Sequence, residues 1–182
     1  EVCPAAGELR DYLMIANDPL RPYYKMYDID LARHMYDGHN WCHLNLPWRE
    51  MADIAIRCLK DSTAMYFSCD VAKFIDLANT NVPALLGVRM DMPKAEAMMT
   101  YESGSSHAMT LVGVALEGDR PVRWKIENSW GQTGAKGFLV ATDDWMDLYA
   151  YRLVVNKKYL DEKTLRLSGQ KPVQLPAWDY LN

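Results

Sequence analysis

A histidine and an asparagine stand 21 residues apart in a setting that suits acid–base chemistry: His107 and Asn128. The segment 107–114 is rich in small and β-branched apolar residues, which predicts a strand with both faces buried and His107 at its start. In the segment 122–128 apolar and charged residues alternate, which predicts a second strand with Asn128 on its inward face. The turn-rich segment 116–121 would join the two as antiparallel neighbours. We therefore expect the His107 ring to lie beside the Asn128 amide.

Such a pair could move protons for a nucleophile. An imidazole that shuttles protons needs one fixed tautomer, so we expect the Asn128 carbonyl to accept Nδ1–H of His107 and to leave Nε2 facing the nucleophile. A neutral amide suits a cysteine, whose thiolate is already stabilised by the imidazolium, whereas serine enzymes more often use a carboxylate. The alternative is a buried histidine with a purely structural hydrogen bond. Trp130, placed to shield the contact from water, favours the catalytic interpretation.

Short motifs around these residues resemble those of the papain-like cysteine proteases. The matching motifs are His-Ala-Met, Glu-Asn-Ser-Trp-Gly and Lys-Gly-Phe, at 107–109, 127–131 and 136–138. Further stretches resemble the bleomycin hydrolase and aminopeptidase C branch of that family, at 11–12, 17–19, 67–71 and 175–179. The resemblance implies an α+β papain-like fold, of which this chain would be the C-terminal antiparallel β-barrel half with one long helix. It also implies that His107 takes the thiol proton and returns it to the leaving amine, while Asn128 orients the ring.

The family's nucleophile has no match in this chain. That cysteine precedes a tryptophan at the start of a helix, where its pKa is low, and a glutamine stands just before it. The four cysteines, none of which has this context, are Cys3, Cys42, Cys58 and Cys69. The sequence also begins with Glu1 rather than methionine, which suggests a piece of a longer protein. We expect a missing N-terminal half to carry the catalytic cysteine, and this chain alone to lack peptidase activity.

The resemblance assigns a role to the end of the chain as well. In the family the C-terminal segment lies along the active-site cleft, where its carboxylate anchors the free amine of the substrate and restricts cutting to N-terminal residues. The stretch 175–179 matches the approach to that end, so Asn182 would be the substrate-binding anchor. Relatives continue several residues further, so the arm is either shorter here or cut. The expected activity is that of a cysteine aminopeptidase that acts on peptides by thiol acyl transfer.

Composition bounds the remaining possibilities. A chain of 182 residues with 49% hydrophobic content can form one domain with a proper core, and we divide it into a peptidase part, 1–160, and an extended C-terminal arm, 161–182. A net charge of −4 without a basic block argues against nucleic-acid partners. There is no apolar run long enough for a membrane span and no signal-like start. The cysteine spacings fit no disulfide framework, which favours a reducing, cytoplasmic setting.

No cofactor is expected, and neither is a metal. The histidines that invite a metal interpretation lie close to Cys42: His34, His39 and His43. Their spacings fit no compact zinc pattern, so we predict exposed loop histidines instead.

Among the other elements, one helix is clear. Asn45 is predicted as its N-cap and Pro47 in its first turn, and apolar residues then recur at helical spacing to Leu59, with Cys58 on the buried stripe. Short apolar segments predict further strands at 64–69, 138–141 and 150–155.

A second hypothesis comes from another functional class. The chain could be an inactive scaffold or oligomerisation half, or part of a pseudoenzyme of the same fold. The resemblance implies a homohexamer, and some relatives bind nucleic acid through basic surfaces, but this chain offers no such surface. An upstream glutamine and Cys-Trp pair would separate the enzyme from the pseudoenzyme.

Overall fold

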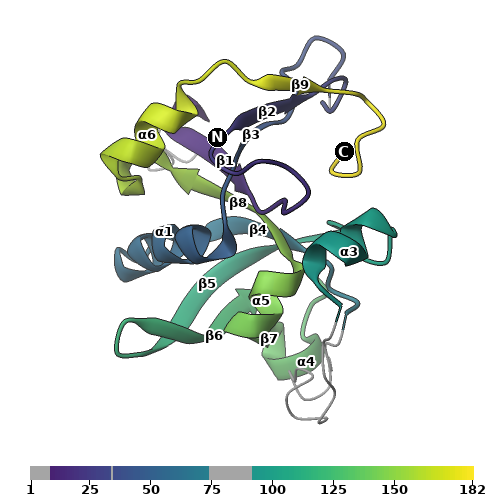
Figure 1. Ribbon diagram of the computed structural model, residues 1–182. Coiled ribbons are helices and arrows are strands. Elements are labelled where there is room, and N and C mark those ends of the chain that lie inside the picture. Colours follow the sequence, from purple (N-terminus) through teal and green to yellow (C-terminus); the bar gives the residue numbers. More distant parts are fainter. Residues whose placement is uncertain (1–8, 34, 74–91) are drawn as a thin grey trace.

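The computed structural model describes residues 9–33, 35–73 and 92–182, and in them one sheet of nine strands runs in the order β7-β6-β5-β4-β8-β1-β3-β2-β9 (Figure 1). The strands are β1 (Tyr12–Ala16), β2 (Met26–Ile29), β3 (Cys42–Asn45), β4 (Met65–Cys69), β5 (His107–Glu117), β6 (Arg120–Glu127), β7 (Phe138–Thr142), β8 (Ala150–Asn156) and β9 (Val173–Leu175). The helices are α1 (Trp48–Lys60), α3 (Lys94–Met99), α4 (Thr133–Lys136), α5 (Asp143–Tyr149) and α6 (Glu162–Ser168), with 3-10 turns η2 (Leu9–Asp11) and η3 (Lys157–Tyr159).

The predicted α+β class with one long helix is confirmed. Most strand pairs are antiparallel, but β1 pairs with β3 and β2 pairs with β9 in parallel, so the sheet is mixed. Strands β7 and β9 are its two edges, and the sheet is therefore open rather than closed into a barrel.

Helix α1 and the short helix α5 contact each other on the same face of the sheet, and the main core lies beneath them. The predicted apolar stripe of α1 is buried, Cys58 included. The predicted cap is wrong, because α1 begins at Trp48, after Pro47, and no side chain caps it. Asn45 instead ends β3, where its Oδ1 accepts a hydrogen bond of 2.9 Å from the backbone N–H of Asp18.

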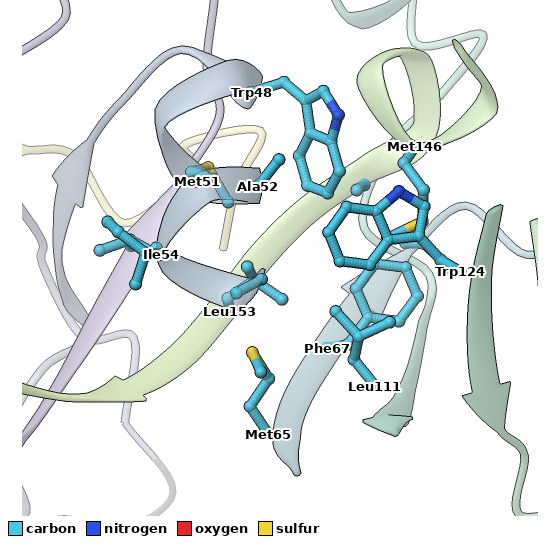
Figure 2. Close-up of a cluster of buried hydrophobic side chains, with 14 of the residues drawn as sticks. Trp48, Met51, Ala52, Ile54, Met65, Phe67, Leu111, Trp124, Met146 and Leu153 are labelled. Atoms are coloured by element: carbon cyan, nitrogen blue, oxygen red, sulfur yellow. The ribbon is translucent and has the colours of Figure 1, made fainter. Parts of the chain in front are cut away.

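Two tryptophans join the core to the strand that leads to Asn128 (Figure 2). Trp48 of α1 and Trp124 of β6 are buried and meet edge to face, with ring centroids 5.7 Å apart. Both indole N–H groups donate to Oδ1 of Asp143, at 3.1 and 2.9 Å, so each buried polar group has a partner. Asp143 therefore has a structural role, as the shared acceptor of both indoles.

Strands β5 and β6 form the predicted hairpin. Its two-residue connection is Gly118-Asp119, and the positive φ of 62° at Gly118 suits a residue without a Cβ atom. The alternation along β6 is confirmed, but burial of both faces of β5 is wrong, since Ala108 is exposed and Thr110 only half-buried. Helices α1 and α5 lie on the core face of the sheet, so neither of them covers the other face of β5.

The C-terminal segment is more structured than the predicted extended arm. Asp161 caps α6 by accepting a hydrogen bond of 2.7 Å from Thr164 N–H, and β9 then adds to the edge of the sheet beside β2. Beyond it, Leu181 is 1% exposed and the hydroxyl of Tyr180 donates to the Asp18 carboxylate. The arm is therefore tied to the body at several points. The division at residue 160 stays a prediction.

The three histidines near Cys42 do not share one environment. His34 lies outside the described residues, and His39 is exposed as predicted. His43 contradicts the prediction, because it belongs to β3 and is buried, with its ring stacked 5.8 Å from that of Tyr27. Burial, assisted by Arg152 and Arg21, lowers the pKa of His43 to about 3. No group of three or more His, Cys, Asp or Glu side chains within the described ranges could hold a metal.

The buried ring predicts a loss of stability in acid. An unfolded histidine binds a proton near pH 6.5, whereas His43 in the fold does so only near pH 3. Between these values the unfolded state binds more protons, so each unit of acidification should lower the free energy of unfolding by about 1.4 kcal/mol. In His43→Phe, which keeps the stacking, this contribution should disappear. Urea unfolding at pH 6.5, 5.5 and 4.5 measures the slope, and equal slopes for the two proteins would contradict the prediction.

Candidate active site

The two residues singled out from the sequence lie in contact. His107 begins β5, and Asn128 follows the last residue of β6, so the antiparallel hairpin brings them together. Their side chains are joined by a hydrogen bond of 2.9 Å between Nε2 of His107 and Oδ1 of Asn128. Asn128 is buried and His107 half-buried, so the ring retains access to solvent on one side.

The hydrogen bonds around Asn128 determine which nitrogen of the ring is protonated. The backbone N–H of Ser129 donates to Oδ1 of Asn128 at 2.8 Å, which fixes that atom as the oxygen of the amide. His107 must then donate through Nε2–H, and Nδ1 keeps its lone pair. The predicted use of the two nitrogens is therefore reversed. Strand register places the ring, but the broad χ2 preference of histidine leaves its orientation undetermined by sequence.

Trp130 lies against the histidine ring. The centroids of the two rings are 4.7 Å apart with a tilt of 36°, and Trp130 is 43% exposed. The indole therefore covers one side of the His107 ring, and its shielding of the His107–Asn128 hydrogen bond from water stays a prediction.

A close backbone approach closes the loop that carries Trp130. The backbone N–H of Asn128 donates to the carbonyl oxygen of Gly137 at 2.9 Å. The φ of Gly137 is 89°, and a Cβ atom there would lie 2.8 Å from the carbonyl oxygen of Gly131. Only glycine fits without a shift of backbone.

A cavity of about 360 Å³ opens beside His107. Polar side chains dominate its lining: His107, Ser68, Ser105, Ser106, Arg33, Arg152 and Asn182. Asn182, the predicted anchor, thus lines the same cavity as the histidine, and its Nδ2 donates to the carbonyl of Ala177 at 2.6 Å. Asn128 lines a neighbouring pocket of about 450 Å³, which shares Tyr66 and Ala108 with the first.

The described cysteines are unsuited to act as the nucleophile. Cys69 is the cross-strand partner of His107, but it is fully buried, and burial raises the pKa of its thiol. Burial likewise raises the pKa of Cys58 to about 11 and that of Cys42 above its ordinary value. A reactive thiol needs the opposite shift. Cys3 lies outside the described residues.

Arg152 is a residue of this cavity that the sequence did not single out. Arg152 lies in β8, 45 residues after His107, and belongs to no motif. One signal in the sequence could have indicated it. Arg152 is a single cation within the apolar segment 150–155, and a charged residue inside a buried strand is uncommon.

No helix within the described part of the chain is both long enough and apolar enough to cross a membrane.

Comparison with known proteins gives a consistent result. Residues 5–182 match the peptidase C1-like family. Bleomycin hydrolase of Gallus gallus is 36% identical over 185 residues, covering 94% of this chain and 41% of the relative. Aminopeptidase E of Lactobacillus helveticus is 37% identical over 179 residues, with the same coverage of 94% and 41%. The chain thus spans about two fifths of the length of these curated relatives.

A solved structure agrees with the sequence matches. The crystal structure of PepW from Lactobacillus rhamnosis HN001 superposes with a TM-score of 0.86 at 35% identity, over 96% of this chain and 42% of that one. The resemblance to the bleomycin hydrolase and aminopeptidase C branch is confirmed, and the chain belongs to the peptidase C1-like family.

Proposed function

We propose that this chain supplies the histidine and asparagine of a cysteine aminopeptidase, which removes N-terminal residues from peptides by thiol acyl transfer. One observation carries the proposal: the His107 ring is held by Asn128 at the edge of an open cavity. The names of the relatives, bleomycin hydrolase and aminopeptidase, support the reaction class.

In the proposed reaction Nδ1 of His107 accepts the proton of a cysteine thiol. The resulting thiolate attacks the peptide carbonyl, and the imidazolium then gives its proton to the leaving amine. Water hydrolyses the thioester with the same histidine as base. Oδ1 of Asn128 holds Nε2–H throughout, so Nδ1 keeps facing the nucleophile. Trp130 limits the access of water to this hydrogen bond.

The thiol comes from outside this chain in our proposal, from an N-terminal portion of the full-length protein. The raised pKa values of the three described cysteines support this. The full-length enzyme would act in the cytoplasm as a homohexamer, as the resemblance implies.

Hydrolysis of aminoacyl-naphthylamides tests the proposed function. The full-length protein should release naphthylamine in a thiol-dependent manner, and the chain of 182 residues should not. Turnover by this chain alone would mean that the nucleophile is misassigned. An inactive full-length protein that lacks an upstream Cys-Trp pair would favour the scaffold or pseudoenzyme instead.

Asn182 is proposed to hold the free amino group of the substrate, because it lines the His107 cavity. Deleting Asn182 from the full-length protein should raise the ratio of the hydrolysis rate of N-acetylated substrates to that of free-amine substrates by about tenfold. This factor corresponds to the loss of one hydrogen bond to a charged group. Removing 180–182 would be a poorer test, since Leu181 is buried and Tyr180 is bonded to Asp18. Lys171→Ala, an exposed change in the same arm, is the control. An unchanged substrate ratio would remove Asn182 from this role.

A further inference from the structure

Arg152 is a buried cation without the partners that burial normally demands. The residue is 5% exposed, and its Nε and Nη2 atoms are buried with no hydrogen-bond partner among the described residues. Its guanidinium lies over the ring of Trp41, 4.7 Å from the centroid. Such stacking holds the plane of the guanidinium but satisfies none of its N–H groups. Leaving charged donors unpaired in the interior is costly, so Arg152 is a candidate for ligand binding.

The register of the sheet places Arg152 on the approach to His107. Arg152 in β8 is the partner of Ser68 in β4, and Ser68 is in turn the partner of Ala108 in β5. Partner residues share a face of the sheet, so Arg152 lies on the face of Ala108, the neighbour of His107 in β5, and two strand spacings separate Arg152 from Ala108 by about 10 Å. A substrate residue near the reacting bond, together with the long arginine side chain, spans this distance. Arg152 and His107 line the same cavity of about 360 Å³.

The lining of the cavity selects an anion. Among the described residues it contains two guanidinium groups, Arg152 and Arg33, and the hydroxyl groups of Ser105 and Ser106, but no aspartate or glutamate side chain. Two acidic groups act electrostatically on Arg152: the phenol of Tyr66, which lines the same cavity, and Asp179, whose carboxylate is already bonded to Arg21. A guanidinium presents a planar fork of N–H donors that matches the two oxygens of a carboxylate.

We propose that Arg152 is the centre of a carboxylate-binding subsite, which holds an acidic group of the peptide substrate beside His107. The inference rests on the proposed peptidase function and deepens it by naming a substrate preference. The carboxylate has two possible sources: an acidic side chain, or the free α-carboxylate of a short peptide.

Calorimetric titration of the full-length protein with three probes tests the proposal without any turnover. N-acetylglutamic acid α-amide offers only a side-chain carboxylate, N-acetylglutamine offers only an α-carboxylate, and N-acetylglutamine amide offers neither. We expect one of the first two to bind at least about tenfold more tightly than the third, and the tighter of them identifies the source. Equal affinities for all three would overturn the subsite while leaving the peptidase activity untouched.

Substitutions assign the preference to Arg152. Arg152→Gln should abolish it, whereas Arg123→Gln, the loss of an exposed arginine on β6, should leave it intact. If Arg152→Gln does not fold, Arg152→Lys carries the test, because it keeps the charge but loses the planar fork. An unchanged preference in the folded variant would overturn the proposal. So would carboxylate binding by this chain that is lost in the full-length protein, since an upstream residue would then be the partner of Arg152.

Discussion

Replacing His107 with alanine in the full-length protein should lower kcat/KM for aminoacyl-naphthylamides by roughly a thousandfold to ten-thousandfold. The ring is the only described group that combines a free nitrogen lone pair at the cavity with a fixed second nitrogen. Without it, nothing in the described residues takes the thiol proton or returns one to the leaving amine. Steady-state kinetics, with circular dichroism to verify folding, measure the effect.

Asn128→Ala provides the matched comparison. It removes the orienting group but leaves the base, so the fall in kcat should be smaller, about tenfold to a hundredfold, because a mobile ring is in the productive geometry for only part of the time. Near-normal rates in the His107 variant, or equal losses in the two variants, would contradict the roles proposed here.

Trp124→Ala should lower the free energy of unfolding by about 3–5 kcal/mol, the usual cost of removing a large aromatic ring from a core. Trp124 is 0% exposed, packs edge to face on Trp48, and donates to Asp143. The alanine variant loses all three interactions and leaves a cavity between α1 and β6. Urea unfolding at neutral pH measures the change.

Trp124→Phe separates packing from hydrogen bonding. Phenylalanine retains most of the ring volume but cannot donate to Asp143, which keeps its bond from Trp48. The expected loss is about 1–2 kcal/mol. A loss below about 1 kcal/mol in the alanine variant would show that the site collapses around the gap, contrary to the close packing described. Since β6 also leads to Asn128, the alanine variant tests how far this packing supports the candidate site.

Much of the scaffold follows from local patterns. The β5–β6 hairpin has alternating residues in its second strand and a glycine at its turn, and α1 has a continuous apolar stripe. These signals act over a few residues, so the sequence predicts both elements and the His107–Asn128 contact that the hairpin creates.

The predictions that were wrong concern residues whose positions depend on contacts between distant segments. Asn45 looks like a helix cap, but its side chain is bonded to the turn at Asp18, 27 residues away. His43 looks like a loop residue, but β3 pairs with β1 and β2 and buries it. Arg152 reaches the cavity only because β8 pairs with β4. Periodicity reports burial along one segment and contains no information about which strand lies next to it.

The central claim is that Asn128 pins His107 with Nδ1 free to accept a proton. Nitrogen-15 NMR of the histidine side chains at neutral pH tests it directly, because protonated and unprotonated ring nitrogens resonate apart. We expect His107 to be protonated at Nε2, with a slowly exchanging Nε2–H that becomes labile in Asn128→Ala. A ring protonated at Nδ1, or a pattern unaffected by that substitution, would contradict it.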